Sequence, residues 1–496
     1  MKRNKASLFA ALAAVLALTS CSGLPKGAGG GGGGGGTGMG DLTLTLHATP
    51  LTPPAGINIL SFDVHITGIS LTPTSGQTVV VNSSFGGSII PVDFARAQSS
   101  SVFLANGASV TAQAYTGITI GFSTPTITYC TQPNPGVQGC AAGTVKTFSG
   151  NLSTPTVPIT LTVPANSKLG LAINLNTTNA LTVVNQAVTA INLIPTAFTT
   201  KTLPPAASSL AAPRLDFFDN ILGLVTAVSG QSVTVLTASG ASFTATGSAS
   251  TFFSQSCVLN NNNGQPCAPK VNQFASIDTA INSDGTLALL EYDPISALQI
   301  VWLEGVVTSI PSSNTKFQIV VTDQSPSTTG GSTTLYTGSV VNVTLIGRGG
   351  GAGSPFPFFI DTKGYPIPTN TFANATDTSA ILPGMTVGLH VIGFTAPSGN
   401  TAGSMTSDTV VLRFTPIPGI VSSVAPPNTF SIRSVPPFFG LNGNSVVQLG
   451  NGNPATFFDG VTDPSTLIVG HTVAINGLYF GPNTATPFVA AKVRAF

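Results

Sequence analysis

Apolar and polar residues alternate along most of this chain, and that period limits its fold more than any other feature. Residues 42–46 read Leu-Thr-Leu-Thr-Leu, and the stretches 62–66 and 157–163 alternate in the same way. A period of two with many β-branched residues is typical of strands with one buried face, and no stretch beyond the leader has a helical period. With 55 Gly and 37 Pro to form turns, the chain is expected to be all-β, built from sandwiches or barrels. Because proline cannot donate a ladder hydrogen bond, the strand around Pro158 is expected at a sheet edge.

A set of strand patterns recurs in the C-terminal half of the chain. Each copy has a Gly-started strand, a turn, a second strand and a Phe-Phe pair, and the last two copies share a Gly-x-Thr-Val strand. Chance similarity among simple β strands is the alternative, but several elements recurring in one order argue against it. Five or so strands and a Gly at the first bend favour a small OB-like barrel. The starts lie at 223–228, 305–310 and 419–424, the pairs at 252–253, 358–359 and 457–458, and the expected closing strands at 297–301, 410–414 and 489–496.

These patterns divide the chain into a β-sandwich followed by three OB-like β-barrel repeats. A Pro/Ala/Ser-rich stretch separates the two parts and is typical of a linker. The predicted parts are a signal peptide 1–20, a Gly-rich tether 21–40, a β-sandwich 41–200, a linker 201–215 and repeats 216–302, 303–416 and 417–496.

Cys21 follows a basic start, a short apolar stretch and Leu18-Thr19-Ser20. This arrangement resembles the lipobox of bacterial lipoproteins, which implies that Cys21 is acylated and that the preceding peptide is removed. The apolar stretch is too short to span a bilayer, which needs ~20 residues. A buried cysteine at a helix end is the structural alternative. The resemblance implies a lipid anchor in the cell envelope, and the absence of Asp after the cysteine favours the outer membrane or cell surface.

Composition excludes some partners. Charged residues make up 7% of the chain, far below the usual ~25%. The leader holds three of the 17 Lys and Arg, which leaves 14 basic against 16 acidic residues. No basic face for nucleic acid is expected, and the sequence has no cofactor-binding motif, since the glycine run at 29–36 has no strand before it. The expected partners are a membrane, through the lipid, and an envelope protein or glycan.

The four remaining cysteines form two local pairs of equal spacing. Cys130 and Cys140 bracket one turn-rich loop, and Cys257 and Cys267 bracket another. An exported chain meets an oxidising environment, so two loop-closing disulfides are predicted. Zinc is the rival for any cysteine pair, but no histidine lies near either pair.

Catalytic motifs are not recognisable in the sequence. Its four histidines form no HExxH, and no GxSxG elbow is present. The two glutamates and 14 aspartates are scattered, and Asp216 and Asp219 fit turn or capping roles better than a glycosidase pair. Calcium is a weaker alternative, since no EF-hand spacing exists. We therefore expect no enzyme, no metal site and no catalytic residue.

Phenylalanines in Pro/Gly-rich segments are the best functional lead. If exposed, they would form apolar patches for a partner, and the alternative is that they fill barrel ends as core. Trp302 stands at the junction of two repeats, where we expect it to pack. The candidate contact residues are Phe356, Phe358, Phe359, Phe438 and Phe439.

The segments 40–44, 62–73 and 92–94, with the repeat starts, resemble a group of uncharacterised bacterial surface lipoproteins. The resemblance implies an N-terminal β-sandwich followed by repeated small β domains, both without a settled activity. Our leading hypothesis is a lipid-anchored envelope protein with a non-enzymatic binding, adhesion or structural role. The alternatives are a secreted-type polysaccharide hydrolase that uses scattered Asp residues, favoured by carboxylates clustered in a deep cleft, and an envelope assembly or transport accessory, favoured by a large apolar groove between units.

Overall fold

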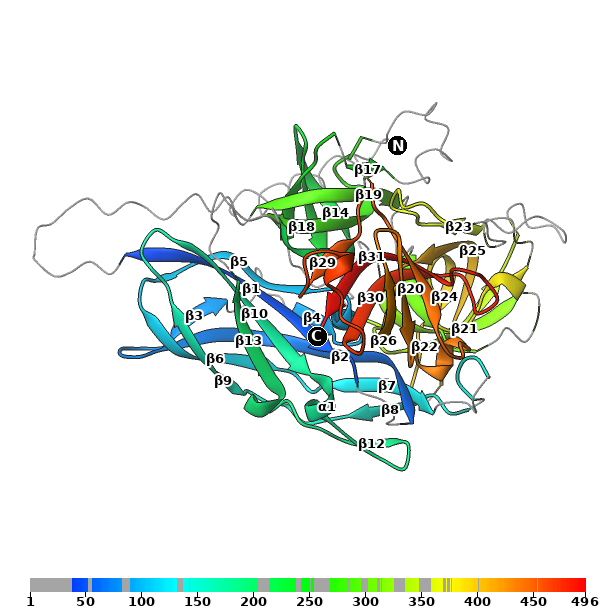
Figure 1. Cartoon of the computed structure of the whole chain (residues 1–496), viewed down its shortest axis with the longest axis horizontal. Coiled ribbons are helices and arrows are strands. Elements are labelled where there is room, and N and C mark those ends of the chain that lie inside the picture. Colours follow the sequence, from blue (N-terminus) through cyan, green and yellow to red (C-terminus); the bar gives the residue numbers. More distant parts are fainter. Residues whose placement is uncertain are drawn as a thin grey trace, which may run out of the picture. The chain divides into compact units, whose positions relative to one another are not determined.

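Strands make up nearly all of the regular structure, which confirms the all-β prediction (Figure 1). Within the described residues, α-helix is limited to one turn, α1 (Thr177–Ala180), and no helix there is long and apolar enough to cross a bilayer. The computed structural model describes residues 38–51, 56–82, 90–131, 137–203, 214–249, 251–253, 268–295, 302–324, 335–347, 358–368 and 372–496, apart from short gaps within these ranges. The predicted signal peptide, Cys21 and most of the tether and linker lie outside the described residues.

The N-terminal part is a β-sandwich whose two sheets share one hydrophobic core. Leu44 of the smaller sheet and Ile118 of the larger sheet are fully buried in that core. The smaller sheet has the order β13-β10-β1-β5, and a β11-β12 hairpin is separate from both sheets. The strands of the smaller sheet are β1 (Met39–Thr49), β5 (Val102–Thr111), β10 (Lys168–Asn176) and β13 (Phe198–Leu203). The hairpin consists of β11 (Leu181–Val184) and β12 (Ala187–Ile191). The larger sheet contains β2 (Ile57–Pro73), β3 (Val79–Asn82), β4 (Ile90–Asp93), β6 (Ala114–Phe122), β7 (Thr126–Thr131), β8 (Lys146–Ser149) and β9 (Thr156–Thr162).

Two strand predictions for the sandwich have different outcomes. The strand that contains Pro158 is β9, which lies at the edge of its sheet and buries every second residue, as expected. The prediction of a single buried face was wrong for β1, because Thr43 and Thr45 are buried along with the leucines between them. The 3-10 turn η1 (Arg96–Gln98) packs against β1 and covers part of its second face.

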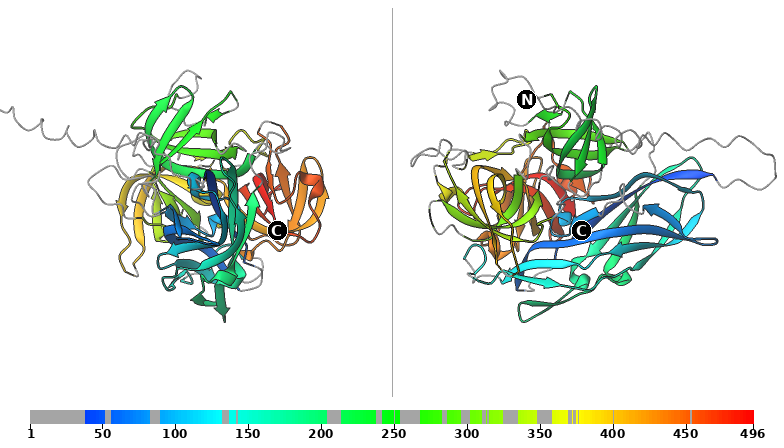
Figure 2. Two further views of the ribbon diagram at one scale, coloured as in Figure 1. Left: turned by 90° about the vertical axis from the view of Figure 1, so that its left-hand side faces the viewer. Right: turned by 180° about the vertical axis from the view of Figure 1, so that it is seen from behind.

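Each C-terminal repeat is a closed five-stranded barrel with one extra short strand (Figure 2). In the first barrel the strand order is β14-β15-β16-β19-β18, and β18 pairs with β14 to close the barrel. The neighbouring strands β16 and β19 run parallel. The other two barrels repeat this order and this parallel closure. The OB-like prediction is therefore confirmed. The barrels comprise β14 (Arg214–Ser229), β15 (Ser232–Thr237), β16 (Ser242–Thr246), β18 (Phe274–Asn282) and β19 (Leu287–Ile295); β20 (Trp302–Val307), β21 (Lys316–Gln324), β22 (Val340–Leu345), β24 (Thr386–Thr395) and β25 (Gly403–Arg413); and β26 (Thr415–Ala425), β27 (Thr429–Arg433), β28 (Ser445–Leu449), β30 (Thr472–Tyr479) and β31 (Phe488–Ala495).

The Phe-Phe pairs form the extra strand of each barrel. They are β17 (Phe252–Phe253), β23 (Phe358–Ile360) and β29 (Phe457–Asp459), and each pairs in parallel with the last strand of its barrel. The closing strands of the second and third barrels match the prediction. The strand expected at 297–301 lies outside the described residues, and β19 (Leu287–Ile295) closes the first barrel.

Direct polar contacts join the sandwich to the barrels. Arg494 at the end of β31 is 2% exposed and donates hydrogen bonds to the Ala97, Gln98 and Ser100 carbonyls and to Ser101 Oγ. Four bonds from one buried guanidinium fix the η1 region to the third barrel, since each unmade bond would leave a buried donor unpaired.

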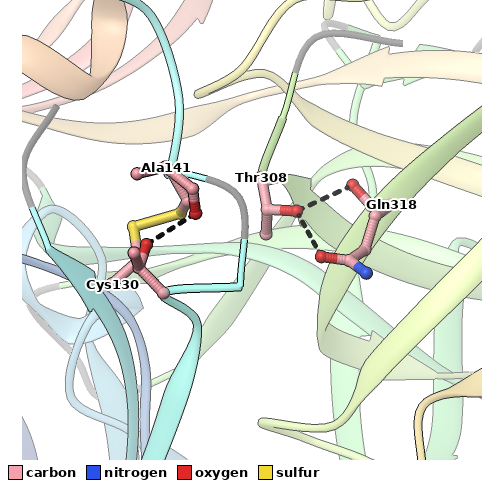
Figure 3. The surroundings of a disulfide bond; sticks show 6 residues. Cys130, Ala141, Thr308 and Gln318 are labelled. Carbon is pink, nitrogen blue, oxygen red and sulfur yellow. Dashed lines mark hydrogen bonds between the residues drawn. A yellow bond between two sulfur atoms is a disulfide. The ribbon is translucent and has the colours of Figure 1, made fainter. Parts of the chain in front are cut away.

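The predicted Cys130–Cys140 disulfide is present, and its loop reaches the barrels (Figure 3). The Cys140 amide donates to the Thr308 carbonyl at 2.7 Å, and the neighbouring Gly139 amide donates to the Phe438 carbonyl at 2.9 Å. The loop therefore adds to the contact between the sandwich and the last two barrels. The second predicted pair, Cys257 and Cys267, lies outside the described residues.

Candidate functional site

An apolar cavity of about 310 Å³ lies where the sandwich meets the second and third barrels. Its wall is formed by β2 of the sandwich, by β24 of the second barrel and by the turn η5 (Pro437–Phe439) of the third. The volume is within the ~300–1,000 Å³ of small-molecule pockets. A 150 Å³ cavity holds one benzene, so this cavity has room for roughly 12 non-hydrogen atoms.

Three buried polar residues line this apolar cavity. Asn58, Thr322 and Thr386 all line it and are 6%, 5% and 3% exposed. Neither the Asn58 amide atoms nor the two threonine hydroxyls hydrogen-bond to any residue that the structure describes. An unpaired buried amide costs about 1–3 kcal/mol in proteins. A ligand group that both donates and accepts hydrogen bonds would remove this cost.

Strand pairing explains why Asn58 faces the cavity. Asn58 on β2 is the register partner of Cys130 on β7. Cys130 and the nearby Leu60 belong to the hydrophobic cluster of the second and third barrels rather than to the sandwich core. This end of the larger sheet therefore turns side chains toward the barrels, and an asparagine in that row is buried between domains.

Arg96 adds a guanidinium to the cavity wall, but its charge is already compensated. Arg96 Nη1 lies 2.9 Å from Asp323 Oδ2, and Nη2 lies 3.7 Å from Glu304 Oε1. Burial raises the pKa of Asp323, although Arg96 opposes that shift. With two carboxyl groups beside one guanidinium, the wall offers no spare positive charge, so the cavity suits an uncharged ligand.

The predicted aromatic contact residues have mixed positions. Phe438 and Phe439 line the cavity, yet they are 4% and 5% exposed and belong to the barrel core. Phe358 is buried in the second barrel, and Phe359 beside it is partly buried. Phe356 lies outside the described residues. The idea of an exposed patch is therefore wrong for Phe358, Phe438 and Phe439, because packing at the barrel ends covers their rings.

A second feature is an ionic cluster buried between the first and second barrels. Arg413 is 1% exposed, and its Nη1 and Nη2 lie 2.7 Å from Asp361 and 2.8 Å from Asp293. Removing one member of such a buried set leaves the others unpaired and costs about 3–5 kcal/mol. The cluster therefore fixes the first barrel against the second. Its members are Asp278, Glu291, Asp293, Glu304, Asp361, Lys363 and Arg413.

Carboxyl groups in this cluster differ in protonation. Burial, reinforced by Asp361, raises the pKa of Glu291 well above its usual value. Burial opposes ionisation of Asp361 too, but Lys363 and Arg413 outweigh it and lower the pKa of Asp361. The surroundings therefore favour the protonated form of Glu291 and the ionised form of Asp361.

The ionic cluster forms part of the wall of another cavity, of about 390 Å³, where all three barrels meet. Asp278, Glu291 and Lys363 line it together with Phe252 and Tyr365. The acids are scattered along the sequence, but the fold brings five of them together in the ionic cluster. Among the described residues, no histidine lines either cavity.

Two of the four histidines form acid–histidine contacts and do not line either cavity. His390 Nδ1 lies 2.7 Å from Asp408 Oδ1 on a partly exposed surface, and His65 lies 3.7 Å from Asp63. The side chains of Asp216 and Asp219 lie outside the described part of the chain. Among described residues, no group of three or more His, Cys, Asp or Glu is arranged to hold a metal ion.

One signal in the sequence could have revealed the cluster. Both glutamates of the chain, Glu291 and Glu304, stand inside apolar stretches, at 287–292 and 301–307. A charged residue within a buried strand needs a partner, so such positions predict an ionic contact. For Asn58, the comparable signal is a polar residue in the apolar run 57–60.

Comparisons with known proteins provide no family for this chain, since no family model and no curated protein matches it. Function must therefore be argued from the residues themselves.

Proposed function

We propose that the chain is a lipid-anchored protein of the bacterial cell envelope that binds an uncharged amphipathic ligand without transforming it. The observation that supports this most is the apolar cavity lined by Asn58, Thr322 and Thr386, whose buried polar atoms find no partner among the described residues. An apolar pocket with a few convergent polar groups is the usual form of a ligand site. The same cavity would serve an envelope transport accessory that passes the ligand on.

The anchor in this proposal is Cys21, in the lipobox-like sequence after the basic and apolar leader. Acyl chains contribute ~0.8 kcal/mol per buried CH₂, and several chains on one cysteine would hold the protein firmly. In this proposal the glycine run that follows serves as the tether between the lipid and the folded part. The outer membrane or cell surface is the proposed location.

Two measurements test this function separately. Cys21→Ala should move the protein from the membrane to the soluble fraction, and continued membrane retention would contradict lipid anchoring. Native mass spectrometry of the protein purified from its own envelope should show one bound small molecule. Its occupancy should fall when Asn58 is replaced by leucine, whereas equal occupancy in both forms would exclude this cavity.

A hydrolase is the second candidate, and the convergence of carboxyl groups favours it. Burial raises the pKa of Glu291 beside the cavity where the barrels meet, which favours the protonated form that a general acid needs. Against it, Lys363 and Arg413 pair with the neighbouring carboxylates Asp278 and Asp361. Release of reducing sugar from envelope polysaccharide, lost in Glu291→Gln, would support the hydrolase and displace the binding proposal.

A further inference from the structure

Lys363 and Asp278 belong to different barrels and touch each other. Asp278 lies in the middle of β18, and Lys363 follows β23 in the second barrel. Lys363 Nζ is in direct contact with Asp278 Oδ2, and the two side chains are 4% and 3% exposed. An amine and a carboxyl group are therefore held at reacting distance in a buried place, 85 residues apart in the sequence.

A third group stands beside this pair. Glu291 is the register partner of Asp278 across β18 and β19, which places both carboxyl groups on one face of the barrel. Glu291 Oε2 lies 3.4 Å from Lys363 Nζ, and the Glu291 side chain is 3% exposed. Its Oε1 atom has no hydrogen-bond donor among the described residues. Glu291 is thus in position to exchange a proton with the reacting groups.

The reaction requires the uncharged forms of the pair. Lys363 Nζ lies 3.8 Å from Asp361 Oδ2 and 5.0 Å from the Phe414 ring centroid, and both neighbours stabilise the ammonium form. Burial opposes that charge, and transfer of the lysine proton to Asp278 yields the neutral amine and neutral acid that react. Burial raises the pKa of Glu291, which keeps a proton available on that side chain.

We propose that Lys363 and Asp278 are joined by an isopeptide bond that the folded chain forms by itself. The lysine nitrogen attacks Asp278 Cγ, and a new C–N bond forms. Glu291 gives its proton to the departing hydroxyl and takes one proton from the nitrogen. One amine and one carboxylic acid become one amide and one water molecule, and Glu291 ends in the form in which it began. No oxidant or other reactant is needed.

Fixed geometry lowers the barrier to this step. Well-oriented groups within one molecule react with effective molarities of roughly 10⁵–10⁸ M. General acid–base assistance by a positioned carboxyl group adds roughly 10²–10⁴-fold in rate. The bond would connect the first barrel to the second and replace a costly buried ion contact with a neutral amide.

Peptide mass spectrometry of the full chain tests the proposal directly. Trypsin cannot cleave after an acylated lysine, so the wild-type digest should contain a branched peptide that joins the Lys363 and Asp278 segments. Its mass should equal that of the two segments less one water. Recovery of a linear peptide cleaved after Lys363, with no branched species, would overturn the proposal.

Variants separate the roles of the three residues. Lys363→Arg and Asp278→Ala should abolish the branched peptide. Glu291→Gln keeps the size of the side chain but cannot exchange the proton, so the cross-linked fraction should fall at least tenfold. Glu304→Gln is the matched control, because Glu304 belongs to the ionic cluster and contacts Arg413 rather than Lys363; it should remain cross-linked. Full cross-linking in Glu291→Gln would contradict the assigned role of Glu291.

Discussion

Replacing Asn58 with leucine should stabilise the protein while it weakens ligand binding. Asn58 is 6% exposed, and neither amide atom has a hydrogen bond to a described residue. A leucine of similar size removes the penalty of about 1–3 kcal/mol for an unpaired amide. Because 1 kcal/mol shifts Tm by roughly 2–4 °C in domains of 150–250 residues, a rise of roughly 2–12 °C is expected.

Urea unfolding of the ligand-free protein, followed by circular dichroism, measures this effect. Asn342→Leu is the control, because Asn342 is exposed and its Oδ1 accepts a hydrogen bond from Gln318. That change should give no gain in stability. A loss of more than about 1 kcal/mol in Asn58→Leu would refute the reasoning, since it would mean that the amide is already satisfied in the free protein.

Three further changes test other parts of the structure. Arg413→Met should cost about 3–5 kcal/mol in urea unfolding, because it leaves Asp293 and Asp361 buried without their guanidinium; a cost below about 1 kcal/mol would contradict this pairing. Burial, with a contribution from Asp93, raises the pKa of Asp63 from 3.8 to about 8, so the folded protein holds a proton that the unfolded chain releases. The free energy of unfolding should therefore fall by up to roughly 5 kcal/mol as the pH rises from 3.8 to about 8. Asp63→Asn should remove this dependence when unfolding is measured at several pH values. Replacing Cys130 and Cys140 together with serine should lower stability by about 2–3 kcal/mol, and an unchanged unfolding midpoint would show that the disulfide does not constrain the unfolded chain.

Local patterns predicted the barrels well because each strand has one face in a barrel core. The stretch 489–496 became a closing strand for that reason, and the Gly-started strands became the first strands. The pattern failed at β19 (Leu287–Ile295), where Glu291 and Asp293 look like solvent-facing positions. Both are buried against the second barrel, so the strand has two covered faces and its polar residues do not mark a surface.

The candidate site could not be predicted because it depends on contacts between domains. Asn58, Thr322 and Thr386 come from three strands whose proximity no local period encodes. The ionic cluster likewise unites residues of separate barrels. Phe438 and Phe439 were found by composition alone, and the structure gives them a role in the cavity wall rather than on an open surface.

Titration with an uncharged apolar fluorophore tests the binding cavity most directly. The Cys21→Ala form avoids detergent, which would take up the probe, and 1-naphthylamine offers an apolar body that fits the cavity volume, with one amine donor. Pro418→Trp places a large ring at the cavity wall, and Val80→Trp, at a position 63% exposed on β3, is the matched control. We predict saturable fluorescence enhancement with one site per chain, retained in Val80→Trp and lost in Pro418→Trp. Absence of saturable binding, or equal binding in both variants, would contradict the cavity as the ligand site.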